Sequence, residues 1–336
     1  MSRTSIEWLR DARLKDCRTS GATMGTRYTA RFVVPEEAHV QTIVADLNAA
    51  VTAVDAQMSN WKADSDLSRL NRAAPGDWVP VSANLATVLL RSIEIGRETG
   101  NAFNIGVGGL VGAWGFGPTG SDGPPIASLG ARASQPLDRL LDIDQPGRRV
   151  RKQASVALDL CGIAKGFGVD ELARVLERHR IDAWLVGIDG EMRARGGKPD
   201  GSPWAIALEA PEDDRRAAMG VIELADAAIA TSGDYRHWRE IDGVRVSHTI
   251  DPRIGAPLRG SVASVTVIAP TCADADAYAT ALMVLGVQAG RAHAQRLGLD
   301  ALFIAREGHG FRATGTGFFD GTDHVPTTGR VAVERT

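Results

Sequence analysis

Cysteines are few in this chain, and long apolar runs are missing. Of the 336 residues only Cys17, Cys161 and Cys272 are cysteines, and no two of them form a CxxC pair. Their wide spacing and odd number exclude a disulfide framework and the common zinc-binding spacings. No apolar stretch reaches the ~18 residues of a membrane-spanning helix, so we expect no transmembrane segment.

An excess of charge of either sign is missing as well. The 38 Lys and Arg residues nearly balance the 41 Asp and Glu residues, for a net charge of −3, and no block of like charge occurs. Nucleic-acid and anionic-membrane binding depend on such blocks, so neither partner is expected. The apolar fraction of 44% and the charged fraction of 24% are typical of a globular enzyme.

As the sequence stands, we expect no export signal in the N-terminal segment. MSRTSIEWLRDARLKDCRTS carries charge throughout, whereas a secretory signal has a basic start, an apolar run and a small-residue cleavage site. The residues ARLKD before Cys17 are too charged for a lipidation signal. The sequence as it stands therefore predicts a cytoplasmic protein, and a start further upstream would make it periplasmic or membrane-anchored.

No repeat, low-complexity tract or polar linker divides the chain. We therefore expect a poorly ordered N-terminal arm over residues 1–20 and a single large domain over residues 21–336. Apolar spacing and N-cap residues predict helices over 39–58, 82–100, 165–179 and 271–286. Alternating apolar residues predict strands over 27–34, 155–160, 183–188, 204–208, 220–224 and 262–269. Helices and strands mix without a regular βαβ rhythm, which indicates an α+β fold with largely antiparallel sheets.

Two oxygen-bearing side chains lie one turn apart in the last predicted helix. Asp276 and Thr280 are spaced at i and i+4, so their oxygens share one helix face. A hard cation such as Mg²⁺ prefers carboxylate, hydroxyl and carbonyl oxygens. The alternative is that Asp274 and Asp276 only stabilise the helix N-terminus through their charge.

A glycine-rich segment, GIAKGFG over 162–168, joins a predicted strand to a predicted helix. Its glycines allow close approach of the backbone, the helix N-terminus offers free N–H groups, and Lys165 adds positive charge. Together these favour an anion such as a pyrophosphate. The spacing is not that of a Walker loop, and a tight strand-to-helix turn remains the alternative.

His248 is the candidate general base. A histidine can take a proton from an attacking hydroxyl near neutral pH, and Asp251 is close enough in the sequence to orient it. The Asp251-Pro252 pair also begins a common turn sequence, so a structural role for Asp251 and a packing role for His248 stay open.

Several large apolar side chains lie beside turn-rich stretches, where they can hold a flat ligand by stacking and sulfur contacts. They are Met24, Trp61, Phe103, Trp114 and Phe116. Core packing is the alternative for these residues, Trp114 and Phe116 above all.

Six segments, read in order, resemble the ApbE family of flavin transferases. They are GATMGTRY, MSNWKADSDLSRLN, LDLCGIAKGFGVDELA, IATSGDY, SHTIDPRIGAPL and ADADAYATALMVLG. The resemblance spans Gly21 to Gly286 and implies a T-fold-like α+β domain. It also implies that FAD is split at its pyrophosphate with the help of Mg²⁺, that FMN passes to a Thr or Ser of an acceptor flavoprotein, and that AMP is released.

The resemblance assigns roles by position. The metal ligands would be Asp276, Thr280 and the backbone carbonyl of Ala164, with His248 as the base and Lys165 offsetting charge at the pyrophosphate. The residues expected to contact FAD are Met24, Trp61, Ala102, Phe103, Asn104, Cys161, Phe167 and Ile250.

Two positions depart from the family pattern. The family usually has Phe-Asp-Pro where this chain has Phe103-Asn104-Ile105, and Gly-Gly where it has Asp189-Gly190. Two other activities therefore remain open at this point. One is an FAD pyrophosphatase, in which water replaces the protein hydroxyl, and the other is a non-catalytic FAD-binding protein, which the loss of the Asp at Asn104 allows.

Overall fold

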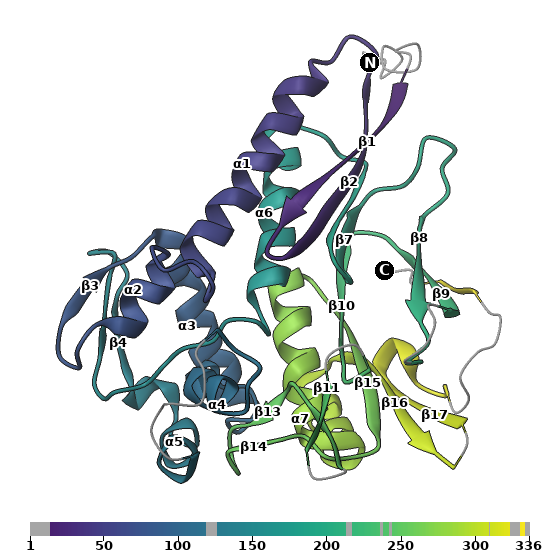
Figure 1. Ribbon diagram of the computed structural model, residues 1–336. Helices are drawn as coiled ribbons and strands as arrows, with labels where there is room; N and C mark the ends of the chain where they lie inside the picture. Colours follow the sequence, from purple (N-terminus) through teal and green to yellow (C-terminus); the bar gives the residue numbers. More distant parts are fainter. Residues whose placement is uncertain are drawn as a thin grey trace, which may run out of the picture.

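An eight-stranded sheet forms the centre of this computed structural model (Figure 1). The structure describes residues 14–118, 126–212, 217–235, 238–241, 244–308, 310–322 and 330–332. The strand order is β1 (Leu14–Thr23), β2 (Thr26–Pro35), β6 (Trp184–Ile188), β7 (Glu191–Arg195), β10 (Ala227–Gly233), β15 (Val262–Ala269), β16 (Asp300–Glu307) and β17 (Gly310–Thr316). Every neighbouring pair is antiparallel, which confirms the expected fold class.

Three long helices form one layer against this sheet. They are α1 (Val40–Met58), α6 (Ala164–Arg178) and α7 (Cys272–Leu297). The apolar residues of α1 recur every three or four positions, and those of β2 alternate, so both elements bury one side. Tyr28, Phe32, Leu47, Leu172 and Trp184 meet in the resulting core. Burial of a side chain of this size contributes about 1.5–3 kcal/mol.

A smaller sheet packs on part of the opposite face. It contains β8 (Trp204–Glu209), β9 (Ala218–Leu224) and β18 (Arg330–Ala332), and β18 is parallel to β9. Trp204 and Ile222 of this sheet pack against Ile229 and Ile268 of the central sheet. The central sheet is therefore buried on both faces where the two sheets overlap.

The segments between α1 and α6 form a helical lobe beside the sheet (Figure 1). Its elements are α2 (Asp66–Arg72), β3 (Trp78–Pro80), α3 (Ala83–Glu98), η1 (Ile105–Val107), α4 (Gly108–Ala113), α5 (Ile126–Ala133), η2 (Leu137–Arg139), β4 (Leu141–Asp144) and β5 (Arg149–Lys152). Two short hairpins, β11 (Trp238–Ile241) with β12 (Val244–Ser247) and β13 (Ile250–Asp251) with β14 (Ala256–Pro257), follow β10. The 3₁₀ turn η3 (Gly317–Phe319) follows β17.

Most predicted elements are confirmed, and the predicted helix cap at Ser82 forms as expected, because its side chain accepts a hydrogen bond from the Leu85 N–H. The predicted strand over 155–160 is wrong. Val156, Leu158 and Leu160 are buried as the alternation suggested, but the backbone bonds to side chains and loops instead of a neighbouring strand. Leu158, for example, exchanges two hydrogen bonds with the side chain of Asn71.

Two predicted boundaries also differ from the structure. The chain is already regular at Leu14, inside the expected arm, because β1 pairs with β2 from Leu14 onward; residues 1–13 lie outside the described part of the chain. The last helix was expected to end at Gly286. Gly286 (φ 76°) does break it, but a second helical stretch continues to Leu297. The continuation packs closely, since a Cβ at Gly290 would lie 2.8 Å from the Phe303 ring.

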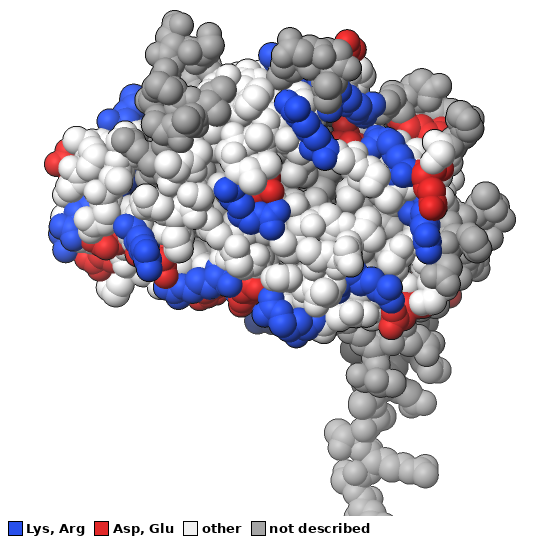
Figure 2. Space-filling view, turned by 90° about the horizontal axis from the view of Figure 1, so that it is seen from below, with Lys and Arg blue, Asp and Glu red and all other residues white. Residues whose placement is uncertain are grey.

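The surface carries mixed charge on the face drawn in Figure 2, where basic and acidic side chains lie in small groups around broad uncharged areas. Many charged side chains of the described residues form ion pairs, as Arg97 does with Asp138 and Arg149 with Asp144. Within the described residues, no helix combines the length and the apolar character needed to cross a membrane.

Candidate active site

A cavity of about 1200 Å³ lies where the helical lobe, the central sheet and the smaller sheet meet. Twelve of the thirteen residues predicted for the site line it. They are Met24, Trp61, Ala102, Phe103, Asn104, Cys161, Ala164, Lys165, His248, Ile250, Asp276 and Thr280. The fold thus brings to one cavity side chains that are spread over most of the sequence.

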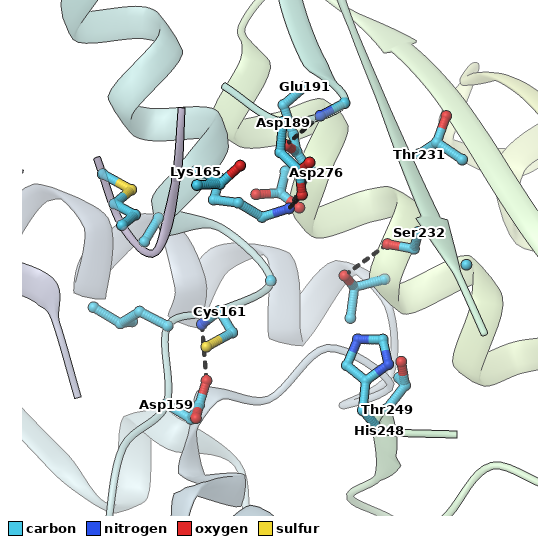
Figure 3. Close-up of a pocket in the computed structure, with 18 of the residues that line it drawn as sticks. Asp159, Cys161, Lys165, Asp189, Glu191, Thr231, Ser232, His248, Thr249 and Asp276 are labelled. Carbon is cyan, nitrogen blue, oxygen red and sulfur yellow. Dashed lines mark hydrogen bonds and ion pairs between the residues drawn. The ribbon is translucent and has the colours of Figure 1, made fainter. Parts of the chain in front are cut away.

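The first turns of α6 and α7 form the polar end of the cavity (Figure 3). The backbone N–H of Gly166 donates to Asp276 Oδ2 at 3.1 Å, which joins the two helices. One turn further along α7, Thr280 Oγ1 lies 3.0 Å from Ser232 Oγ at the end of β10. Asp276, Thr280 and Ala164 at the start of α6 all line this end.

Carboxylates outnumber cations at this end. The Lys165 Nζ lies 2.6 Å from Glu191 Oε1 and 3.7 Å from Asp189 Oδ2, and both Glu191 and Asp276 are buried. Burial raises the pKa of Asp276 to about 7; the negative charge of Glu191 acts in the same direction and Lys165 in the opposite one. Burial opposes the charge of Lys165, but Glu191 and Asp276 outweigh it and raise the pKa of the lysine.

Oxygen donors of the kind that a hard cation prefers line this end. They are the carboxylate of Asp276 and the hydroxyl of Thr280, and Ala164, whose carbonyl was predicted as a third ligand, lines the same cavity. With three acidic side chains around one lysine, further positive charge is electrostatically favoured. Among the described residues no group of three or more His, Cys, Asp or Glu side chains forms a metal site, so a cation here needs the hydroxyl and carbonyl oxygens as well.

His248 follows β12 directly and lines the cavity on the side where Ser232 lies (Figure 3). Of the two roles considered for Asp251, the structure shows the structural one. Both oxygens of Asp251 accept hydrogen bonds from the Arg253 side chain, at 2.9 and 2.7 Å, and Oδ1 also accepts from the Arg253 N–H. Asp251 therefore stabilises its own turn, which is the alternative left open by the sequence.

The apolar rim of the cavity comes from turns. Met24 (φ 46°) and Gly25 (φ 73°) form the two-residue turn between β1 and β2, and such turns need positive φ at both positions. A methionine seldom takes this conformation, which here places its side chain against Gly168 at the start of α6. Trp61, in the loop after α1, is 70% exposed and lies at the edge of the same cavity.

Phe167 is the one predicted site residue that does not line the cavity. It is buried in the main core cluster, and the guanidinium of Arg174 lies 5.4 Å from the centre of its ring. Its position on α6 explains this, because Phe167 lies two residues after Lys165 and so points away from the cavity that Lys165 lines.

Sequence reasoning missed Asp159 and Glu191. Asp159 Oδ1 accepts from the Cys161 N–H at 2.8 Å and Oδ2 from Asn60 Nδ2 at 2.9 Å, which orders the loop before α6. The charge of Asp159 also raises the pKa of the Cys161 thiol well above its usual range. Glu191 follows the Asp189-Gly190 turn, so the hairpin pattern was the available signal for its place at the site.

Comparison with known proteins decides the family. The model of the ApbE family matches residues 24–303. This chain belongs to the ApbE family. It is 39% identical to the FAD:protein FMN transferase of Vibrio cholerae over 87% of this chain and 88% of that protein. It is 38% identical to the protein of the same name from Klebsiella pneumoniae, over 87% and 85% of the two chains.

Solved structures of ApbE proteins share the fold. The flavin transferase ApbE from Vibrio cholerae matches with a TM-score of 0.80 and 37% identity, over 91% of this chain and 98% of that one. The apo form of the Pseudomonas stutzeri flavinyl transferase ApbE matches with a TM-score of 0.82 and 36% identity, over 94% and 98%. The single-domain α+β expectation is therefore confirmed.

Asn104, where the resemblance implied an Asp, uses its side-chain amide as a hydrogen-bond donor. Its Nδ2 donates to the carbonyls of Ala133 and Gln135 and to the Asn101 side chain, at 2.7–3.0 Å, while its Oδ1 accepts from the Gly106 N–H at 2.7 Å. An aspartate cannot make the first three contacts, because a carboxylate has no donor. The Asn104 side chain thus connects the end of α5 to η1 through hydrogen bonds.

We expect Asn104→Asp to lower the free energy of unfolding by about 2–3 kcal/mol, because it sets a buried carboxylate against three oxygens. Urea unfolding monitored by circular dichroism measures this. Asn48→Asp is the matched control, since Asn48 donates one exposed hydrogen bond to Val44, and it should cost less than about 1 kcal/mol. Equal losses in the two variants would contradict the role given to Asn104.

The raised pKa of Asp276 predicts a pH dependence of stability in metal-free protein. A carboxyl whose pKa is about 7 when folded and ordinarily 3.8 contributes stability that is complete below pH 3.8 and lost as the pH rises through 7. In EDTA we therefore expect the melting temperature to fall between about pH 4 and pH 7.

Asp276→Asn should flatten this profile and melt at least about 2 °C above the unsubstituted protein at pH 8, because it removes a buried charge. Adding Mg²⁺ should stabilise the unsubstituted protein and leave the variant unchanged. A variant that melts below the unsubstituted protein in EDTA would mean that Lys165 fully compensates Asp276.

Proposed function

We propose that this chain is an FAD:protein FMN transferase, which cleaves FAD at its pyrophosphate and transfers the FMN half to an acceptor protein. The observation that carries the proposal is the meeting of Asp276, Lys165 and His248 in one cavity. Relatives that bear this name align over more than four-fifths of both chains. Binding alone would require only a cavity of suitable shape. A cluster of acidic residues that can hold a cation, together with a candidate general base, is what catalysis requires.

The cavity suits FAD in size and lining. About 1200 Å³ exceeds the upper end of ordinary ligand pockets, which hold ~300–1,000 Å³, so a dinucleotide and part of an acceptor can be accommodated. Met24, Trp61 and Phe103 offer flat or polarisable surfaces for the flavin ring. The N-terminus of α6 and Lys165 face the polar end, where the pyrophosphate is then held.

Asp276, Thr280 and the carbonyl of Ala164 would hold Mg²⁺. A bound Mg²⁺ would neutralise charge on the pyrophosphate oxygens and lower the barrier to phosphoryl transfer. Glu191 and Asp189 keep Lys165 charged and directed to the same end of the cavity, so its ammonium offsets part of the charge that develops there.

His248 would act on the acceptor. Its imidazole takes the proton from a Thr or Ser hydroxyl, and the hydroxyl oxygen forms a new bond to the phosphorus on the FMN side. The bond from that phosphorus to the bridging oxygen breaks, and AMP leaves with that oxygen. With water in place of the hydroxyl, the same residues would yield free FMN and AMP.

The test is to incubate the protein with FAD, Mg²⁺ and a set of synthetic peptides that each carry one Thr or Ser, and to follow AMP and peptide mass together. An FMN adduct that appears in step with AMP supports the transferase. Release of AMP and free FMN, with no adduct on any peptide or on a purified acceptor flavoprotein, would show that the protein is a pyrophosphatase and not a transferase. FAD binding without any release of AMP would show that the protein binds FAD and does not cleave it.

Two variants then test the assigned roles. Asp276→Ala should abolish Mg²⁺-dependent AMP release and keep some FAD binding, because the cation loses its carboxylate. His248→Ala should slow transfer by about 10²-fold or more with FAD affinity kept within a few-fold. His179→Ala is the matched control, since His179 contacts Asp46 outside the cavity and its loss should leave the rate unchanged. Full activity in Asp276→Ala would refute the metal assignment.

A further inference from the structure

The proposed cation ligands come from two different helices. α6 supplies Ala164, and α7 supplies Asp276 and Thr280. Mg²⁺ demands near-ideal octahedral geometry, so its affinity depends on how these two helices are placed relative to each other. The structure contains a contact that fixes this placement and touches no cavity residue directly.

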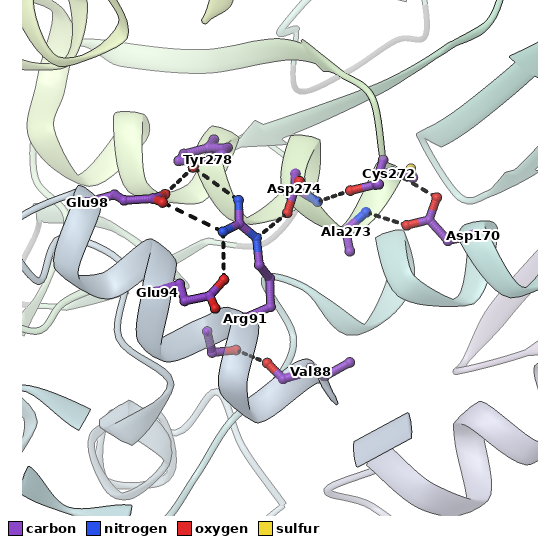
Figure 4. A network of polar contacts seen from close by, with 11 residues as sticks. Val88, Arg91, Glu94, Glu98, Asp170, Cys272, Ala273, Asp274 and Tyr278 are labelled. Carbon is purple, nitrogen blue, oxygen red and sulfur yellow. Dashed lines mark hydrogen bonds and ion pairs between the residues drawn. The ribbon is translucent and has the colours of Figure 1, made fainter. Parts of the chain in front are cut away.

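Asp170 on α6 makes that contact (Figure 4). Its Oδ1 accepts from the Cys272 N–H at 3.0 Å, and its Oδ2 accepts from the Ala273 N–H at 3.0 Å. These are N–H groups of the first turn of α7, which have no acceptor within their own helix. A carboxylate of one helix thus caps the N-terminus of the next, four residues before Asp276.

The charge of Asp170 is balanced from the sheet. Arg193 Nη1 lies 2.9 Å from Asp170 Oδ1, and the carboxylate itself is buried. Arg193 and Glu191 are two residues apart on β7 and so share a face of the sheet. That face therefore pairs with α6 twice, through Arg193 with Asp170 and through Glu191 with Lys165.

Gly166 lets the helices approach closely between these contacts. A Cβ at this position would lie 2.3 Å from the carbonyl oxygen of Cys272, so no larger residue fits without moving α7. The Gly166 N–H is the same one that donates to Asp276. On its other side, α7 is held by α3, where Arg91 Nε lies 2.7 Å from Asp274 Oδ1 (Figure 4).

We propose that Asp170 is a positioning residue for the cation site: by capping α7 it sets the distance from Asp276 and Thr280 to the Ala164 carbonyl. This rests on the proposed function for the identity of the cation. Partners that orient metal ligands from outside typically contribute 10–100-fold in metal affinity. We expect Asp170→Asn to lower the Mg²⁺ affinity about tenfold or more. The amide oxygen of Asn can accept from only one of the two backbone N–H groups, and its NH₂ group then faces the other N–H.

The experiment measures Mg²⁺ binding directly, by isothermal titration calorimetry of the full chain saturated with FAD. Asp170→Asn should raise the Mg²⁺ dissociation constant about tenfold or more and leave the FAD dissociation constant within about threefold. Asp66→Asn is the matched control. Asp66 also accepts from a backbone N–H, that of Ser82, and pairs with an arginine. This contact joins α2 to the start of α3, and neither helix carries a proposed cation ligand, so the Mg²⁺ affinity of the variant should be unchanged.

Gly166→Ala keeps the test decisive if Asp170→Asn proves unstable. Alanine is favoured over glycine inside a helix by about 1 kcal/mol, so without the close contact this change would stabilise the protein. We expect instead a Mg²⁺ affinity at least about tenfold weaker, because α7 must shift. Unchanged Mg²⁺ affinity in both variants would overturn the positioning role of Asp170.

The outcome is separable from that of the proposed function. If the unsubstituted protein binds Mg²⁺ but releases no AMP from FAD, the transferase activity is refuted, and the ratio of Mg²⁺ affinities still decides the role of Asp170. If AMP is released normally and Asp170→Asn binds Mg²⁺ as tightly as the unsubstituted protein, the transferase stands and the positioning role falls.

Discussion

The buried carboxylate of Asp276 at the contact of α6 and α7 is the constraint on which the rest of the site depends. A carboxylate taken out of water is costly unless a cation or hydrogen bonds compensate it. Here one backbone N–H and one lysine, shared with two other acids, compensate the charge only in part, and burial raises the pKa of Asp276 to about 7. Further positive charge beside Asp276 is therefore electrostatically favoured, as the proposed cation site requires.

The fold serves this site by dividing the work among its layers. The helix N-termini supply the polar end, where dipoles and N–H groups favour phosphate. The turns of the central sheet supply part of the rim, and two of them hold a non-glycine residue at positive φ, Met24 and Asp189. Strain of this kind costs about 1–3 kcal/mol and is typical of residues whose direction matters.

Much of this could be predicted from the sequence, because the signals were local. The apolar period of α1, the Ser82 cap and the alternation of β2 each involve residues within one element, and twelve of the thirteen residues predicted for the site line the cavity. The failures have a common cause. The strand expected over 155–160 is extended and buried on one side as a strand is, and only its hydrogen-bond partners, which come from distant segments, differ.

Contacts between distant residues could not be predicted. The partners of Asp170 lie about a hundred residues further along the chain, so no local pattern predicts them. In the sequence Asn104 suggested only the loss of a carboxylate. In the structure its Nδ2 donates to three oxygens. Charge and spacing identify candidates, and tertiary structure decides their partners.

The most direct test of this account is the position of the metal. Mn²⁺ can replace Mg²⁺ at oxygen sites and scatters anomalously, so crystals grown with FAD and Mn²⁺ locate it. The account predicts one strong anomalous peak within about 2–2.5 Å of an Asp276 carboxylate oxygen and of Thr280 Oγ1, next to the pyrophosphate. A peak bound by Glu191 and Asp189 alone, away from Asp276, would contradict it.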